Sequence, residues 1–233
     1  MWRRSRLLAI LVLLGGLATV VGVIVYLVKQ EPDFYVATLN APQWDDNLAK
    51  SARLATRVQD LKNEIRSAPE WGAEFTAAEL NGFFAANLGP RGGLSSLLPE
   101  KTSAPRIAIE ENRLKLGFRY GRGFWSTVVW VELRIWLVAE ESNLVGVEVC
   151  DLRAGRIPLA AQSILDSITE SAHESNIDVT WYRQGPNPVG LFRFFADQPR
   201  VTAQILTLVV ADGKVVVAGR TPQEQAPPAP QTP

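Results

Sequence analysis

Hydrophobic and polar positions divide the chain into regions with different periodicities. Residues 7–28 form an uncharged apolar run, LLAILVLLGGLATVVGVIVYLV. Between residues 43 and 105 the apolar positions recur at intervals of three and four, which predicts helices, and after Arg106 they alternate, which predicts strands. The pattern therefore predicts an α+β protein: a transmembrane helix, then a long, curved antiparallel meander sheet packed with amphipathic helices.

The apolar run is long enough to cross a bilayer. As a helix it extends for about 33 Å, and a hydrocarbon core is about 30 Å thick. Three arginines precede it, so the positive-inside rule places residues 1–6 in the cytoplasm and the main domain outside. A cleaved signal is the alternative, but VIVYLVKQ lacks a small-x-small cleavage site. We expect a single-pass signal anchor in a cell-envelope membrane.

The rest of the chain divides into a spacer, a domain and a tail. Residues 29–42, with Pro32 and Pro42, predict an extended spacer, and residues 43–220 form the extracytoplasmic domain. Residues 221–233 are rich in proline and poor in apolar residues, which predicts a disordered tail.

Two helices are predicted at the start of the domain. In EFTAAELNGFFAANLG, Thr76 and Glu79 have the spacing of a capping box, Gly89 ends the helix, and Phe83 and Phe84 lie on its apolar stripe. The other helix precedes it, from residue 42 to residue 68. Its predicted apolar face consists of Leu48, Ala52, Ala55, Val58, Leu61 and Ile65.

Four strands in meander order follow from the alternating residues. RIAIE and RLKLGFRY flank a turn at Glu111 and Asn112, and LVGVEVCDL ends the meander. A helix is then expected with Pro158 in its first turn, and later strands include a hairpin at Asp212 and Gly213. The predicted buried side of that helix is Leu159, Ile164, Leu165, Ile168 and Ala172.

The segment WSTVVWVELRIWLVA, residues 125–139, is apolar on both faces of the predicted strand. Phe124, Val128, Trp130, Trp136 and Val138 crowd its even face. Leaving them all in water would forfeit on the order of 10 kcal/mol, comparable to the net stability of a domain, so something is expected to cover them. Packed helices or a closed barrel would do so, and so would an apolar groove that receives a ligand. The candidate groove residues are Phe83, Phe84, Val128, Trp130, Trp136 and Val138.

Charge and motifs argue against nucleic-acid, metal and catalytic chemistry. Basic and acidic residues balance at 24 each, which removes the net field that nucleic acid requires. With a single cysteine and a single histidine, we predict no metal site, no cofactor and no catalytic residues. His173 is expected at a helix end and Cys150 in a buried strand. Glu132 and Arg134 are expected to pair with each other or across strands, with a lipid headgroup as the alternative.

Two motifs carry a family resemblance. FTxxELN in EFTAAELNGFF and GRIPL in DLRAGRIPLAAQSILDSI, together with the strands between them, resemble the YpmS-like family of membrane-anchored bacterial envelope proteins. More distantly, the chain resembles the tubular lipid-binding (TULIP) superfamily. Gly155, Arg156 and Pro158 match the family's residues before the helix. The resemblance implies a curved sheet wrapped around a helix, with a lipid-lined interior.

Three functions follow from these features. The favoured one is a non-enzymatic, membrane-anchored protein that binds lipid or another apolar ligand between sheet and helix; its expected partners are the membrane, lipid and envelope proteins. The alternative is a membrane-tethered scaffold or interaction subunit of an envelope machine, with Trp130, Trp136 and LFRFF as its contact patch. An envelope hydrolase with convergent acids is the third.

Overall fold

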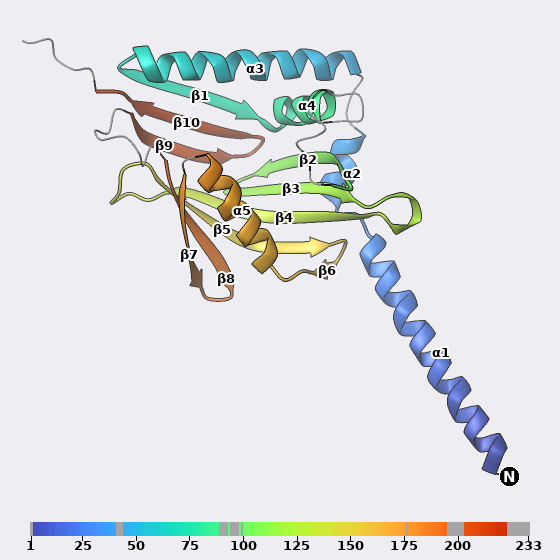
Figure 1. Cartoon of the computed structure of the whole chain (residues 1–233). Helices are drawn as coiled ribbons and strands as arrows, with labels where there is room; N and C mark the ends of the chain where they lie inside the picture. Colours follow the sequence, from blue (N-terminus) through green and yellow to red (C-terminus); the bar gives the residue numbers. More distant parts are fainter. Residues whose placement is uncertain are drawn as a thin grey trace, which may run out of the picture.

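The computed structural model describes residues 2–40, 44–88, 93, 98, 100–175, 177–194 and 203–222, in which a long amino-terminal helix projects from an α+β domain (Figure 1). The helices are α1 (Trp2–Lys29), α2 (Asp33–Leu39), α3 (Trp44–Ser67), α4 (Ala77–Asn87) and α5 (Gln162–Glu174).

The described strands form two antiparallel sheets. The smaller has the order β1-β10-β9 and the larger the order β2-β3-β4-β5-β8-β7, with the short β6 paired to β5. The bounds are β1 Glu70–Thr76, β2 Thr102–Glu110, β3 Arg113–Tyr120, β4 Thr127–Leu137, β5 Leu144–Ala154, β6 Ile157–Pro158, β7 Asp178–Gln184, β8 Asn187–Arg193, β9 Gln204–Ala211 and β10 Lys214–Arg220.

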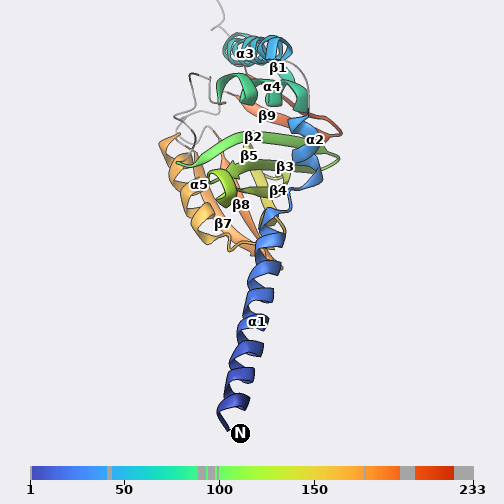
Figure 2. The same ribbon diagram turned by 90° about the vertical axis from the view of Figure 1, so that its right-hand side faces the viewer.

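The core lies on one face of the larger sheet. Ile109 and Leu114 of that sheet pack with Val210 of β9, which joins the two sheets. Along the same face Val149 packs with Leu165 of α5, so α5 covers this side of the larger sheet. Helix α3 packs against both β1 and α4, and it lies at the far end of the domain from α1 (Figure 2).

Several expectations are confirmed. The strands β2 to β5 form the predicted meander, and Asn112 adopts the left-handed φ of 57° that its turn requires. Thr76 and Glu79 form the capping box, with each side chain bound to the other's backbone N–H. Gly213 lies in the turn between β9 and β10. Local signals of this kind depend on few residues.

The predicted fifteen-residue strand is shorter in the structure. β4 contains 11 residues, and Phe124 and Trp125 lie before it in a 3₁₀ turn. The turn forms because Gly121 and Gly123 adopt φ values of 90° and 54°, which direct the chain away from the sheet. Phe124 and Trp125 are consequently 69% and 82% exposed.

The predicted extended spacer contains a helix instead. Tyr35 of α2 is fully buried, and its hydroxyl donates to the carbonyl oxygen of Ala104 at 2.8 Å. Its ring and that of Phe34 lie against Gly117 of β3, where a Cβ would come within 3.1 Å of both rings. The segment is therefore part of the domain.

Other elements differ in their bounds or faces. β1 was not predicted, and α5 begins at Gln162 because Ile157 and Pro158 pair with β5 first, which leaves Leu159 exposed. The predicted apolar face of α3 is wrong at three positions: Leu48, Ala52 and Ala55 are exposed. Leu54 is buried instead. Gly89 and residues 223–233, the bulk of the predicted tail, lie outside the described residues.

Among the described residues, no single helix is long and apolar enough to cross a membrane. Two helical segments with a bend of 50° between them, Leu13–Lys29 and Asp33–Leu39, are long and apolar enough when taken together. The transmembrane helix thus stays a prediction.

Asn81 of α4 closes the free edge of β2. Its side-chain amide donates to the carbonyl oxygen of Ile107 at 2.7 Å and accepts from the Ile107 N–H at 2.9 Å. Asn81→Ala should lower the free energy of unfolding by about 2 kcal/mol, since each lost hydrogen bond contributes about 1 kcal/mol. Urea unfolding of the full chain in detergent measures this, with the exposed Asn63→Ala as the control. Equal stability of the two variants would contradict this role.

Candidate functional site

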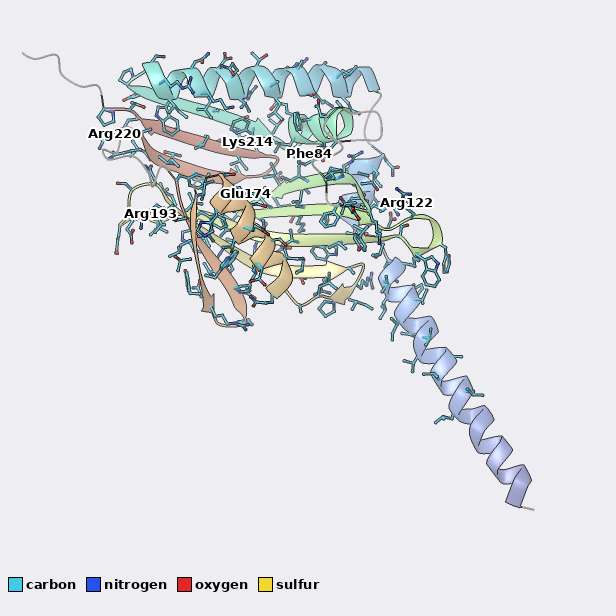
Figure 3. All side chains as sticks on the ribbon, viewed as in Figure 1. Phe84, Arg122, Glu174, Arg193, Lys214 and Arg220 are labelled. Atoms are coloured by element: carbon cyan, nitrogen blue, oxygen red, sulfur yellow. The ribbon has the colours of Figure 1, made fainter. Side chains whose placement is uncertain are left out.

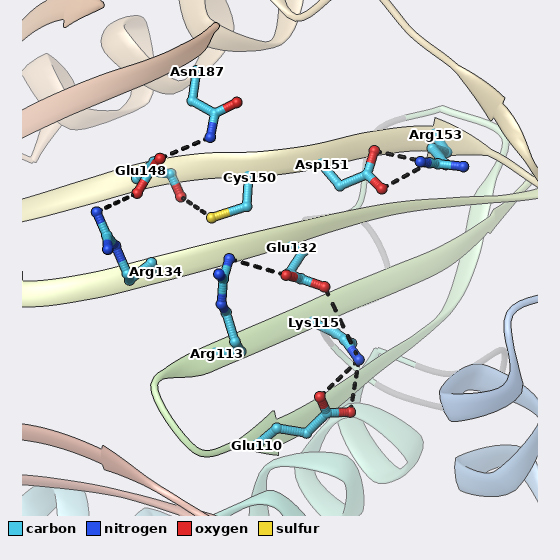
Figure 4. A network of polar contacts seen from close by, with 10 residues as sticks. All are labelled: Glu110, Arg113, Lys115, Glu132, Arg134, Glu148, Cys150, Asp151, Arg153 and Asn187. Carbon is cyan, nitrogen blue, oxygen red and sulfur yellow. Dashed lines mark hydrogen bonds and ion pairs between the residues drawn. The ribbon is translucent and has the colours of Figure 1, made fainter. Parts of the chain in front are cut away.

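The even face of β4 holds a row of paired charges (Figure 4). Glu132 lies 3.0 Å from the guanidinium of Arg113 and 4.0 Å from Nζ of Lys115. Farther along the strand, Arg134 lies 2.6 Å from the carboxylate of Glu148. The expectation of cross-strand pairing for Glu132 and Arg134 is confirmed. These ion pairs answer the question of what covers this face.

The two tryptophans of this face are covered by the same charged side chains. The guanidinium of Arg134 lies 5.2 Å from the Trp136 ring centroid, and that of Arg153 lies 5.9 Å from the Trp130 ring centroid. Below Trp136 lies Gly146, where a Cβ would come within 2.4 Å of the indole. The guanidinium groups therefore lie over the two rings, while each is also paired with a carboxylate, Arg134 with Glu148 and Arg153 with Asp151.

The acids of this network are all partnered. Asn187 donates to Glu148 at 2.7 Å, in addition to its pair with Arg134, and Asp151 accepts from Arg153. Convergent acids were the requirement for a hydrolase, and these carboxylates instead lie beside cations. Burial raises the pKa of the Cys150 thiol, which lies on β5 within this network and therefore favours the neutral, weakly nucleophilic form. Among the described residues, no group of histidine, cysteine or acidic side chains could hold a metal ion.

The six candidate groove residues lie in three places. Phe83 and Phe84 stack edge to face on α4, with ring centroids 6.3 Å apart. Val128 is 1% exposed, Trp130 packs on Phe34 of α2 at 6.0 Å, and Trp136 lies on Gly146. Val138 follows β4 in the turn to β5. None of these six residues lines any of four cavities in the described part of the chain. The cavities lie at α4 and β2, at α5 and β7, at the end of α5 and at the β3–β4 turn.

A cleft between helix and sheet does occur, but it lies at α4 and β2. It has a volume of about 350 Å³. Its apolar lining includes Ala77, Ala85, Ile107 and Ile109, and its polar lining consists of Thr38, Asn47, Lys50, Asn81 and Arg106. Other cavities lie between β5, α5 and β7, about 570 Å³, and near His173 at the end of α5, about 330 Å³. Ligand pockets typically have about 300 to 1,000 Å³, so the α4–β2 cleft is at the small end of this range.

The described part of the expected contact patch of Trp130, Trp136 and LFRFF is also packed within the fold, and Phe195 lies outside the described residues. Phe192 stacks edge to face on Trp181 of β7, with centroids 6.0 Å apart. The indole nitrogen of Trp181 donates to Thr169 of α5 at 2.8 Å. These aromatic side chains hold β7, β8 and α5 together.

The end of α1 is bound directly to the larger sheet. The backbone N–H of Arg156 donates to the carbonyl oxygen of Leu27 at 3.0 Å, and the hydroxyl of Thr127 donates to that of Val28 at 2.6 Å. Nζ of Lys29 donates to the carbonyl oxygen of Ser126 at 2.8 Å. The Leu27 carbonyl also accepts from the N–H of Gln30 at 3.3 Å, so the domain adds to the hydrogen bonds at this helix end, where carbonyls run out of helical donors. We call this set of contacts the α1 junction.

Gly155 lies at the centre of the α1 junction. Its φ is 58°, and a Cβ there would come within 2.4 Å of the Val28 carbonyl oxygen and 2.5 Å of that of Leu27. Its own carbonyl accepts from the indole of Trp130 at 2.9 Å. Sequence reasoning noted Gly155 as part of a motif but missed this contact with α1, because nothing local indicates it.

An ion pair and a buried tyrosine fix the chain that follows the α1 junction, up to and including α2. Glu31 lies 2.5 Å from the guanidinium of Arg119 on β3. Burial raises the pKa of the Tyr35 hydroxyl, which stays a neutral donor to Ala104. The chain between α1 and α2 is thus fixed on both sides.

No protein-family model matches this chain, and no curated protein or solved structure matches it either. The resemblance to the YpmS-like and TULIP families therefore stays a prediction, and function has to be argued from the geometry.

Gly155→Ala should loosen the α1 junction. The left-handed φ alone should cost about 1 kcal/mol, and the clash with the Leu27 and Val28 carbonyls about 1 to 3 kcal/mol more. The distance distribution between spin labels at Leu17→Cys and Tyr182→Cys, in a Cys150→Ser background, should broaden.

Gly213→Ala is the matched control, because Gly213 has a φ of 77° and a Cβ added there would meet no described atom within 4 Å. Gly213→Ala should lower the free energy of unfolding through its left-handed φ, but it should not broaden the distance distribution between the two spin labels. An unchanged distribution in Gly155→Ala would contradict a rigid α1 junction.

Proposed function

We propose that this protein is a single-pass, membrane-anchored scaffold that holds a non-enzymatic α+β domain in a fixed orientation outside the cytoplasm, as an interaction subunit of a cell-envelope machine. The observation that carries the proposal is the α1 junction, in which Thr127 of β4 and Arg156 of the β5–β6 turn bind the last carbonyls of an otherwise exposed apolar helix.

The exposed side chains of α1 support a membrane environment. Burying a large apolar side chain contributes about 1.5 to 3 kcal/mol, so leaving this set in water would cost on the order of 10 kcal/mol or more, as much as a whole domain's stability. Lipid removes that cost. The exposed set is Leu13, Leu14, Leu17, Val20, Val21, Val23, Ile24 and Tyr26.

Length and charge support a single crossing by α1. The helix has 28 residues, or about 42 Å at 1.5 Å per residue, when the apolar residues before Leu13 are included. α2 is assigned to the domain instead, because Tyr35 is buried there. The arginines at positions 3, 4 and 6 favour a cytoplasmic amino terminus.

The rigid attachment favours a scaffold over a tethered enzyme. The carboxylates on the face of the larger sheet that carries the even residues of β4 are paired with cations, as at Glu132 and Glu148. A fixed helix presents each surface of the domain at a constant height and angle above the bilayer. Among these surfaces, Leu206 and Val209 of β9 are exposed apolar side chains suited to a protein contact.

Cysteine labelling tests the topology. In oriented membrane vesicles with the domain side outward, an impermeant maleimide should label Tyr182→Cys and not Ser5→Cys, each in a Cys150→Ser background. The protein should also resist alkaline extraction. Labelling of both positions, or release by alkali, would refute the anchor.

The same vesicles test the scaffold. A photo-crosslinking residue at Leu206 should give one discrete protein adduct in native membranes, and one at the exposed Gln59 of α3 should give none. The absence of any adduct from Leu206 would count against a protein partner at β9.

The α4–β2 cleft favours a second function, the binding of a lipid chain or another apolar ligand. Ala85→Phe should fill the cleft, and native mass spectrometry of the full chain should then lose any copurified lipid that the unaltered protein carries. Ala55→Phe, on the exposed side of α3, should retain it. If neither the unaltered protein nor the Ala55→Phe variant carries lipid, the lipid-binding function is contradicted and the scaffold is the one proposed function that stands.

A further inference from the structure

The turn between β3 and β4 exposes two aromatic side chains that the proposed scaffold role does not use. Phe124 and Trp125 are mostly exposed, and their rings stack edge to face with centroids 5.4 Å apart. Tyr120, at the end of β3, is also exposed. Contiguous exposed apolar side chains of this kind mark contact sites, whereas apolar side chains scattered singly over a surface need no such explanation.

The turn is held in a defined conformation. The N–H of Trp125 donates to the carbonyl oxygen of Arg122 at 3.2 Å, and the N–H of Ser126 donates to that of Gly123 at 3.1 Å. The N–H of Gly121 donates to the carbonyl oxygen of Lys101 at 2.9 Å. Because the backbone is already ordered, the two rings are presented without a further loss of backbone entropy.

The turn lies beside the carboxyl end of α1. Nζ of Lys29 donates to the carbonyl oxygens of both Phe124 and Ser126 and lies 4.8 Å from the Phe124 ring centroid. Figure 3 shows Arg122 on this turn, above the point where α1 leaves the domain. If α1 crosses the bilayer, the turn is at the level where the helix leaves the hydrocarbon core.

Cationic side chains accompany the aromatic ones. An open cavity of about 670 Å³ is lined by Lys101, Tyr120, Arg122 and Trp125, together with the carboxylate of Glu100. Lys101 and Arg122 are both exposed. Tryptophan and tyrosine concentrate at membrane interfaces, and arginine and lysine pair there with lipid phosphates.

We propose that the turn formed by residues 120–125 is a second contact with the bilayer that α1 crosses, with Phe124 and Trp125 in the interfacial region and Arg122 and Lys101 at the lipid phosphates. The inference rests on the proposed function, because it requires α1 in the membrane. A second contact with the bilayer restricts the tilt of the domain relative to the membrane plane. The occupant is lipid rather than a protein because Lys29, the last residue of α1, contacts this turn directly, which places the turn at the end of the proposed membrane helix.

Depth-dependent fluorescence quenching tests the contact. The full chain, with Cys150→Ser, is reconstituted in phosphatidylcholine vesicles that contain phosphatidylglycerol. An environment-sensitive nitrobenzoxadiazole label is placed at Trp125→Cys, at Leu17→Cys or at Gln59→Cys. We expect a lipid with a doxyl group near its headgroup to quench the label at residue 125, and a lipid with doxyl at its chain end to quench the label at residue 17. The label at residue 59, an exposed position of α3 at the far end of the domain from α1, should be quenched by neither.

Each other outcome is decisive. Quenching at residue 17 without quenching at residue 125 would overturn the turn contact and leave the anchor standing. Loss of quenching at residue 17 would overturn the anchor and the turn contact together. A blue-shifted emission at residue 125 without lipid quenching would show that protein, a second copy included, covers the turn. Quenching at all three positions would show that the domain collapses onto the bilayer without a specific contact.

Discussion

The last carbonyls of α1 are the constraint on which the arrangement depends. A helix end leaves carbonyl oxygens without partners, and burial of such groups against protein requires donors. Here the donors are the N–H of Arg156, in the turn between β5 and β6, and the hydroxyl of Thr127, the first residue of β4. The close approach is possible only because Gly155 has no side chain. The direction of α1 is consequently set by the sheet that forms the body of the domain.

The same sheet separates its two faces by chemistry. Leu133 of β4 packs against both apolar clusters, whereas the next residue, Arg134, pairs with Glu148 on the opposite face. The large aromatic residues of that second face made a lipid groove an attractive expectation. Their rings are instead covered by arginine guanidinium groups, by Phe34 and by the bare backbone of Gly146. Sequence periodicity counts side chains by type and does not reveal that a charged side chain can lie over an aromatic ring.

Local signals in the sequence were sufficient for much of the fold and for little of the site. The capping box at Thr76, the turn at Asn112 and the meander depend on neighbouring residues and were predicted. β1 was missed because its partner, β10, lies at the other end of the chain. The face of α3 was misjudged because Arg57, polar by composition, turns inward to Glu79 at 3.1 Å. The α1 junction joins residues about a hundred positions apart, so no local pattern indicates it.

The nature of the connection between helix and domain determines which function the fold can serve. A flexible spacer over residues 29–42 would let the domain wander by about 20 Å, from roughly 5 to 6 Å times the square root of its length. The structure instead leaves only Gln30, Glu31 and Pro32 between α1 and α2, and Glu31 is bound to Arg119. A partner that binds one face of such a domain loses little orientational freedom on binding, since α1 has already removed it. Rigid attachment is thus an advantage for a scaffold, whereas an enzyme that meets soluble substrates gains nothing from it.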